Sequence, residues 1–436
     1  MRAEADLMNY DKEPKGVFLM IDNKSFYASV EAVMRGLNPL KVVMVVISEQ
    51  ENTNGGLILA TSPMAKKLFG LKANVSRQRD LPCDPRIIMV PPRMNLYIKR
   101  NLQINEIFKQ YVAEEDLYPY SIDESILDIT KTWKLFGETP EEVAKKIQRK
   151  VRRQLGLYTT IGVGENPLQA KLALDNFAKK SNDLIGTITY NTVAQKVWMI
   201  PKLTDVWGIG RRTTERLQKL GINNMNELAH SNPYFLKQEF GIIGTQLFAT
   251  AWGIDRTILS ERVKPKENSV GNSQVLPRNY QQQCEIETVI KEISEQVAAR
   301  LRHRCQQCGE LTLSIGFSYQ STINSGFSQS LKVIPTNSNV EIFKYAKEIF
   351  QKYWKGQPVR NIAIFTAKLS YQIGEQLNLF EPFPRISKHQ TDQLVDQIRA
   401  EYGFTALVYA RSLTKGGTAI QRASLVGGHN GGNAYE

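Results

Sequence analysis

Two adjacent carboxylates stand in the middle of a run that otherwise favours a buried strand. The run from Tyr120 to Ile129 is YSIDESILDI, and it carries Asp123 and Glu124 side by side. A carboxylate that leaves water without a partner is heavily penalised, so such a pair needs either a cation or a solvated turn. These residues taken alone favour the turn, because Asp and Glu at a hairpin tip are ordinary.

Another acidic residue stands at the end of an apolar strand. The segment Val17–Ile21 is VFLMI and leads directly into Asp22. Ser25 can cap a helix over 25–35, where apolar side chains recur at helical spacing until Gly36 ends it. Exposed amides at such a helix start suit phosphate. A strand-end Asp together with an Asp-Glu pair offers the oxygen ligands that hold two Mg²⁺ ions in enzymes that displace pyrophosphate.

The two stretches together resemble the signature motifs of Y-family translesion DNA polymerases, in the UmuC-like bacterial branch (the ImpB/MucB/SamB family). The matching segments are IDNKSFYASVE and SIDES, and the resemblance covers nearly the whole chain. It implies a template-directed DNA polymerase of low fidelity that copies past damaged DNA, in DNA repair and the SOS response. It also implies that Asp22, Asp123 and Glu124 are catalytic and bind two Mg²⁺ ions, with the backbone carbonyl of Asn23 completing the first site.

Composition agrees with a polyanionic partner. The 436-residue chain has a formal charge of +13, which favours nucleic acid, although an acidic membrane surface would also attract it. The start of the chain is polar and the longest aliphatic run is Val42–Ile47, so we expect no membrane contact and a cytoplasmic, nucleoid-associated monomer. Cys305 and Cys308 form a lone C-x-x-C, and a structural zinc site usually needs two such pairs, so reduced thiols are expected.

The order of the predicted elements indicates an α/β multidomain (α+β) chain. Strands and helices alternate first, short helices follow, and a charged, Pro-containing stretch leads into a second α/β unit. By resemblance this is a right-hand polymerase with a ferredoxin-like palm, small fingers, a helical thumb with a helix-hairpin-helix, and an α/β little finger. The Gly-rich end at 427–432 is expected to be mobile. The expected bounds are 1–26 and 93–185 for the palm, 27–92 for the fingers, 186–259 for the thumb, 260–271 for a linker, 272–372 for the little finger and 373–436 for a C-terminal tail.

The resemblance also assigns residues to the triphosphate of an incoming dNTP. The segment ATSPMAKKLFG matches the one that grips the triphosphate, and it places Thr61 and Lys67 on phosphate-contacting positions, with Lys66 able to share the task. Many members have Tyr where this chain has Met64 and Arg where it has Lys67, so Lys67 offers a single point charge. Lys171 matches the palm lysine that reaches toward the β- and γ-phosphates. A solvated basic helix face is the alternative for Lys66 and Lys67.

One aromatic pair is assigned to the nucleotide's sugar. Tyr27 lies where the family has a steric gate, an aromatic ring that clashes with a 2′-hydroxyl and so selects deoxyribose. Phe26 is grouped with the nucleotide-binding residues, and its ring is expected to face the core. An ordinary pair of core aromatics is the alternative.

Two regions are expected to hold primer-template DNA. The segment Leu203–Thr214 indicates a helix-hairpin-helix, in which the Gly208 and Gly210 turn lets backbone amides approach phosphate while Arg211 and Arg212 add charge. On the little finger the resemblance suggests backbone contacts from polar and basic side chains, namely Arg278 and Lys332, with Asn272, Ser273, Arg300, Arg302 and Arg304 as further candidates.

A short tail motif points to a protein partner. The pentad QLNLF at 376–380 resembles the peptide by which bacterial polymerases dock on the sliding clamp, the DNA polymerase III beta subunit. Leu377, Leu379 and Phe380 would be the apolar anchors and Gln376 the polar one. A strand edge folded on the little finger is the alternative.

Two functions from other classes remain open on these residues. A helix-hairpin-helix nuclease or glycosylase would use the Arg-rich turn but has no need for Tyr27, Lys171 or the triphosphate segment. A non-catalytic DNA protein bound to the clamp would tolerate loss of the three acids, all of which are present. Primer extension with Mg²⁺ and dNTPs discriminates among the three.

Overall fold

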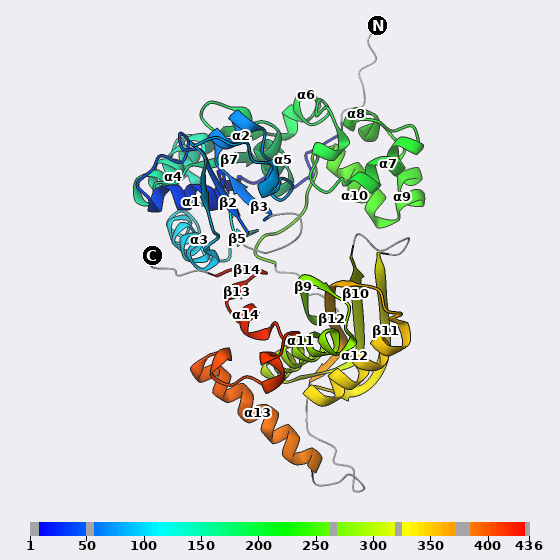
Figure 1. The fold of residues 1–436 in the computed structure, drawn as a ribbon. Helices are drawn as coiled ribbons and strands as arrows, with labels where there is room; N and C mark the ends of the chain where they lie inside the picture. Colours follow the sequence, from blue (N-terminus) through cyan, green and yellow to red (C-terminus); the bar gives the residue numbers. More distant parts are fainter. Residues whose placement is uncertain (1–7, 49–55, 262–267, 319–324, 372–383, 432–436) are drawn as a thin grey trace.

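The computed structural model describes residues 8–48, 56–261, 268–318, 325–371 and 384–431. These ranges form two lobes (Figure 1). The upper lobe holds the described residues up to 261, and the lower lobe holds the second α/β unit with most of the described part of the tail. Within the described ranges, no helix combines the length and the apolar character needed to cross a membrane.

A five-stranded sheet forms the centre of the predicted palm. Its strand order is β5-β6-β1-β7-β8, with β1 antiparallel to both of its neighbours and β7 parallel to β8. The strands are β1 (Phe18–Asn23), β5 (Leu117–Pro119), β6 (Glu124–Asp128), β7 (Thr159–Gly164) and β8 (Ile185–Ile188).

Both faces of this sheet are covered by helices, which explains why β1 is apolar from Phe18 to Ile21. Leu19 and Ile21 pack with helices α3 (Met94–Phe108) and α4 (Pro140–Leu155) on one face. Phe18 and Met20 pack with α5 (Pro167–Asn176) on the other. Helix α4 has clear signals at both ends, because Thr139 caps its start, Pro140 opens it and Gly156 ends it with φ 69°.

Helix α5 lies unusually close to β7. A side chain at Gly162 would place its Cβ 2.0 Å from the carbonyl oxygen of Ala170, and one at Gly164 would come 2.3 Å from the Ala170 nitrogen. The two glycines therefore serve close helix–strand packing, which fixes α5 along the central strands.

The predicted fingers are built on a second, three-stranded sheet. Its order is β3-β2-β4, from β2 (Met44–Ile47), β3 (Ile58–Thr61) and β4 (Ile88–Val90), with α2 (Pro63–Phe69) following β3. Helix α1 (Phe26–Met34) joins two cores, since Phe26 and Val30 pack into the palm while Ala28 and Ala32 pack on the fingers sheet.

The prediction that Ser25 caps α1 is wrong. Ser25 adopts a left-handed conformation with φ 50° and ψ 50°, and its side chain makes no capping hydrogen bond. A capping serine needs an extended backbone, which the sharp turn from β1 into α1 does not allow. Ser62, with φ −62° and ψ 158°, is the serine that caps a helix here, α2.

The predicted thumb consists of short helices around one apolar cluster. Leu217, Leu228, Leu236 and Leu247 meet there, and Leu172 of α5 joins them. The side-chain amides of Asn166 and Gln169 donate to the carbonyl of Gly253 at 2.8 and 3.0 Å, which ties the thumb to the palm. The helices are α6 (Val193–Lys196), α7 (Arg211–Lys219), α8 (Met225–Ala229), α9 (Pro233–Phe240) and α10 (Ile242–Ala251).

The predicted little finger is a four-stranded antiparallel sheet with two helices against one face. The strand order is β11-β10-β12-β9. Residues 262–267 of the predicted linker lie outside the described residues, and the first strand begins at Val270. The elements are β9 (Val270–Tyr280), α11 (Gln283–His303), β10 (Gln306–Phe317), β11 (Gly326–Thr336), α12 (Asn339–Tyr353) and β12 (Val359–Tyr371).

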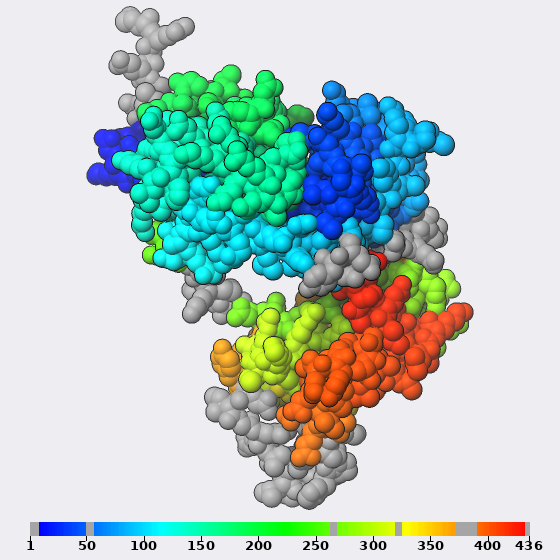
Figure 2. Space-filling view, turned by 90° about the vertical axis from the view of Figure 1, so that its left-hand side faces the viewer, coloured from blue at the N-terminus to red at the C-terminus, as the bar shows by residue number. Residues whose placement is uncertain are grey.

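The tail folds against the little finger and then returns to the palm. It contains α13 (Pro384–Tyr402), α14 (Ala419–Ala423), β13 (Leu425–Val426) and β14 (His429–Asn430). In Figure 2 its orange and red residues cover one side of the lower lobe. Arg302 of α11 pairs with Asp396 of α13 at 2.6 Å. The side chain of Arg302 is 7% exposed, so its suggested role as a DNA contact is wrong.

The mobility predicted for the Gly-rich end is also wrong for residues 427–431. Gly427 and Gly428, with φ 60° and 84°, form the turn between β13 and β14. Val426 packs against the palm core, and the carbonyl of Gly431 accepts a hydrogen bond from the Asn95 N–H at 2.8 Å. The tail thus connects the little finger to the start of α3.

A buried carboxyl on α11 should make the stability of this little-finger and tail unit depend on pH. Burial raises the pKa of Glu295 to about 7; Lys291 and Arg399 oppose this shift, and Glu292 and Asp392 add to it. Between its unfolded value, near 4.5, and about 7, the folded state keeps a proton that the unfolded state has released. Stability is therefore expected to fall as pH rises across this interval.

Glu295→Gln should remove that pH dependence and stabilise the protein at pH 8 by about 3 kcal/mol. Thermal unfolding measured from pH 4.5 to 8 checks this. Glu348→Gln, at an exposed position of α12, is the control and should follow the wild type. A Glu295→Gln melting curve that keeps the wild-type pH dependence would contradict the assignment.

Candidate active site

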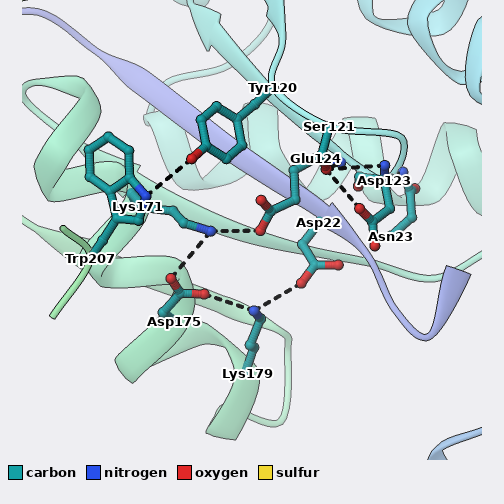
Figure 3. A network of polar contacts seen from close by, with 10 residues as sticks. All are labelled: Asp22, Asn23, Tyr120, Ser121, Asp123, Glu124, Lys171, Asp175, Lys179 and Trp207. Carbon is teal, nitrogen blue, oxygen red and sulfur yellow. Dashed lines mark hydrogen bonds and ion pairs between the residues drawn. The ribbon is translucent and has the colours of Figure 1, made fainter. Parts of the chain in front are cut away.

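The three predicted acidic ligands meet at one end of the palm sheet. Asp22, near the end of β1, lies directly opposite Glu124, the first residue of β6, in the antiparallel register. Asp123 immediately precedes Glu124, and its carbonyl oxygen accepts from the backbone and side-chain N–H groups of Asn23 at 2.9 and 3.0 Å. Figure 3 shows the three carboxyl groups close to one another at this end of the sheet.

Burial and a neighbouring carboxylate disfavour the charged forms of Asp123 and Glu124. Burial raises the pKa of Asp123, and the Asp22 carboxylate adds to that, while the Ser121 hydroxyl, donating at 2.7 Å, opposes it. Burial also raises the pKa of Glu124 despite its hydrogen bond from Lys171. A bound cation would relieve both effects.

Two lysines already compensate part of this charge. Lys171 Nζ lies 2.6 Å from Glu124 Oε1, and Lys179 Nζ lies 3.0 Å from Asp22 Oδ2. Asp175 lies between the lysines and contacts both. Burial works to lower the pKa of Lys179, but the carboxylates of Asp22 and Asp175 hold it above its ordinary value.

Lys179 and Asp175 were missed in the sequence analysis. Lys171, Asp175 and Lys179 follow one another at intervals of four, the spacing that puts residues on one face of a helix. That spacing was the available signal. It was weak because α5 ends at Asn176 and Lys179 lies in the following short turn, Ala178–Lys180.

The donor set suits a hard divalent cation, although the side chains are not gathered around one. Among the described residues, no three His, Cys, Asp or Glu side chains stand in a metal-binding arrangement. The reason is that Lys171 and Lys179 hold Glu124 and Asp22, while Asp123 is turned to Ser121. Within those residues the side-chain oxygen of Asn23 is buried and has no hydrogen-bond partner. Carboxylate and amide oxygens of this kind are what Mg²⁺ binds, so the residues fit the ion.

The predicted steric gate lies beside the acids and is held by a buried network. Tyr27 stacks on Tyr97 with ring centroids 4.4 Å apart and an interplanar angle of 13°. The Tyr97 hydroxyl donates to Glu31 at 2.8 Å, and Arg93 binds the same carboxylate through two nitrogens at 3.0 and 2.7 Å. Burial raises the pKa of Tyr27, and the nearby Asp123 carboxylate adds to this.

Tyr97 and Glu31 were missed by the sequence analysis, since their contacts join residues 62 to 66 positions apart. Phe26, by contrast, is 3% exposed in the palm core. The prediction that its ring faces the core is confirmed, and its side chain is not open to a ligand.

A cavity lined with lysines opens next to Asp22. It has a volume of about 470 Å³ and lies between the end of β1 and α2. Burial, with repulsion from Lys66 and Lys179, lowers the pKa of Lys24 despite the attraction of Asp22. Near the cavity, the Thr61 hydroxyl is buried and, within the described residues, without a hydrogen-bond partner. The lining residues are Asp22, Lys24, Ser25, Pro63, Lys66, Lys67, Thr160 and Lys179.

A second cavity, open to solvent, lies between the palm and the predicted helix-hairpin-helix of the thumb. Its volume is about 760 Å³, and its lining includes Asp175 and residues 204–210. Gly208 has φ 89°, and the position of a Cβ at Gly208 or Gly210 is open, as close approach of a ligand to the backbone requires. Trp207 Nε1 donates to the Tyr120 hydroxyl at 3.2 Å, so this turn touches the connection between β5 and β6 that carries Asp123.

The remaining predicted DNA contacts differ in availability. Arg211 and Arg212 are exposed, and Arg211 pairs with Glu215 at 2.8 Å. Lys332 is exposed on β11. Arg278 is engaged, because it pairs with Glu285 at 2.6 Å and lies over the Tyr280 ring. The clamp motif, Gln376, Leu377, Leu379 and Phe380, lies outside the described residues.

Comparison with known proteins places this geometry in a family. The model described as the impB/mucB/samB family matches residues 21–175, and its C-terminal domain matches residues 267–379. The IMS family HHH motif matches residues 190–222. The chain belongs to the impB/mucB/samB family. These matches include the three acids, the Gly208 turn and the little-finger sheet.

Relatives match nearly the whole length of this chain. It is 38% identical over 424 residues to a protein of Bacillus subtilis (strain 168) named UvrX for UV-damage repair, covering 97% of this chain and 100% of the relative. It is 35% identical to DNA polymerase IV 2 of the same organism, covering 95% and 98%. DNA polymerase IV 2 of Halalkalibacterium halodurans is 31% identical, with 95% and 99% covered.

A solved structure shares the fold. A Y-family DNA polymerase chimera built from Dbh and Dpo4 matches with a TM-score of 0.67 at 20% identity, covering 82% of this chain and 100% of the other. The predicted fold class, a mixed α/β right-hand polymerase with a helix-hairpin-helix, is confirmed.

Proposed function

We propose that this DNA-directed DNA polymerase, which carries out translesion synthesis in DNA repair, joins nucleotides at the end of the palm sheet. The observation that carries the proposal is the register of β1 and β6, which sets Asp22 opposite Glu124 with Asp123 beside them. A lysine-lined cavity adjoins the same edge. Carboxylates next to a cationic cavity suit metal ions bound together with a triphosphate.

The acids are assigned by their places in the site. Asp22, Asp123 and the backbone carbonyl of Asn23 would hold the Mg²⁺ that accompanies the dNTP, and Glu124 would help hold a second at the primer terminus. Two such ions lower the pKa of the 3′-hydroxyl and stabilise charge on the leaving pyrophosphate.

Lysines on both sides of the cavity orient the triphosphate in this proposal. Lys66 and Lys67 contribute from α2 and Lys179 from the palm, all three lining the cavity. Lys171 does not line the cavity. Its ammonium lies 2.6 Å from Glu124, so its predicted phosphate contact would be made beside the acids. Thr61 would add its hydroxyl, which is buried without a partner within the described residues.

The proposal also assigns residues that contact DNA and the sliding clamp, and a cellular setting. The amides at Gly208 and Gly210, with Arg211, Arg212, Arg278 and Lys332, are proposed to hold the backbone of primer-template DNA. The +13 charge supports this as a sequence-independent attraction. The QLNLF motif is proposed to recruit this polymerase, acting as a cytoplasmic, nucleoid-associated monomer, to the sliding clamp. The SOS response is the proposed setting.

The metal ligands are tested by primer extension with purified protein, Mg²⁺ and dNTPs. Asp123→Ala and Glu124→Ala should each lower extension to less than about a thousandth of wild type, because the ligands act in the transition state. DNA binding should stay near normal, since it rests on phosphate contacts elsewhere. Asp128→Ala, at the far end of β6, is the matched control. Retained extension by Asp123→Ala would refute the mechanism.

The steric gate is tested by sugar selection. Tyr27→Ala should raise the incorporation of rNTPs relative to dNTPs by about tenfold to a hundredfold, because the ring that Tyr97 supports would no longer meet a 2′-hydroxyl. Tyr118→Ala, an exposed tyrosine of β5, controls for loss of an aromatic ring. An unchanged preference in Tyr27→Ala would assign Tyr27 to the core alone.

The clamp motif is tested with a double variant. Burial of Leu379 and Phe380 in a clamp groove should supply several kcal/mol of docking. Changing both to Ala should remove synthesis stimulated by the clamp and leave clamp-free extension intact, while Asn378→Ala should change neither. Loss of both activities together with a lower melting temperature would instead place these residues in the little-finger core.

A further inference from the structure

Asp175 links two lysines that each hold a different acid of the candidate active site. Its Oδ1 lies 2.8 Å from Lys179 Nζ, and its Oδ2 lies 3.3 Å from Lys171 Nζ. The two ammonium groups continue to Asp22 and Glu124. Figure 3 shows the resulting chain of five side chains, in the order Glu124, Lys171, Asp175, Lys179 and Asp22.

These five side chains are partly shielded from water, which strengthens the electrostatic interactions among them. The side chains of Lys171 and Glu124 are 10% and 16% exposed, and that of Asp175 is 28% exposed. Lys171 also lies 5.8 Å from the centre of the Tyr120 ring. Interactions among such half-buried charges are screened less than those of surface pairs.

The two lysines compete with any cation for the same oxygens. Each ammonium occupies one carboxylate that the proposed function gives to Mg²⁺. Asp175 competes in turn for the lysines, since it offers each of them another carboxylate oxygen. Without Asp175, both lysines would bind Asp22 and Glu124 more strongly, and the site would also lose one negative charge. Both consequences weaken cation binding.

We propose that Asp175 is a positioning residue that draws Lys171 and Lys179 away from the metal ligands and so sets the affinity of the site for divalent cations. The proposal rests on the proposed function, because it takes Asp22 and Glu124 as the ligands. Asp175 itself would touch neither the ions nor the substrates. Its position at the end of α5, where the glycines of β7 fix the helix against the sheet, keeps it between the two lysines.

The first test measures binding of Mn²⁺ alone by electron paramagnetic resonance, without DNA or nucleotide. Asp175→Asn should weaken Mn²⁺ binding by about tenfold, the order expected from one unit charge nearby in a half-buried site. Lys171→Met should tighten it, because a competing ammonium is gone. Asp175→Glu keeps the charge and should stay close to wild type. If Asp175 and Lys171 only supported the fold, Asp175→Asn and Lys171→Met would not change Mn²⁺ affinity in opposite directions.

The second test titrates Mg²⁺ in primer extension. Asp175→Asn should need about tenfold more Mg²⁺ for half-maximal rate, while the rate at saturating Mg²⁺ stays much closer to wild type. Asp128→Asn makes the same charge change at the far end of β6 and should leave both quantities unchanged.

The outcomes separate the two proposals. If wild type binds Mn²⁺ and extends primers but Asp175→Asn keeps wild-type metal affinity, the role of Asp175 is refuted and the polymerase site stands. If Asp123→Ala still extends primers, the proposed metal site itself fails. If Asp175→Asn does not fold, Lys171→Met decides, since unchanged or weaker Mn²⁺ binding there would refute the competition.

Discussion

The antiparallel pairing of β1 with β6 is the constraint on which the site depends. It sets Asp22 opposite Glu124, and a slip of one residue would turn one of the two acids to the other face of the sheet. The register is fixed because burial alternates along β6, and its fully buried Leu127 pairs with Leu19 in the palm core. The packing of apolar side chains therefore determines where the carboxylates stand.

Carboxylates brought together in this way carry an electrostatic cost, and the surrounding residues offset it. Burial and the neighbouring Asp22 raise the pKa of Asp123 and Glu124. Lys171 and Lys179 supply positive charge to the same edge. The two lysines thus offset part of the negative charge that the proposed metal ions would neutralise.

The tail adds a connection between the two lobes. Its last hairpin reaches the start of α3, where Asn95 bonds to Gly431. Two residues further along that helix, Tyr97 supports the ring of Tyr27. The position of the little finger is thus tied to the helix whose Tyr97 stacks on Tyr27.

The sequence by itself determined the elements and the identity of the acids. The apolar run before Asp22, the pair at Asp123 and Glu124, and the capping residues of α4 are local patterns, and local patterns fix strands, helix ends and charged side chains. Only the tertiary structure decided which lysines meet the acids, that Tyr97 supports Tyr27, and that Arg302 is buried under the tail. It also decided against Ser25 as a cap and against a mobile Gly-rich end. These features arise from contacts between residues far apart in the chain, or from backbone turns imposed by packing, and such information is absent from any short segment.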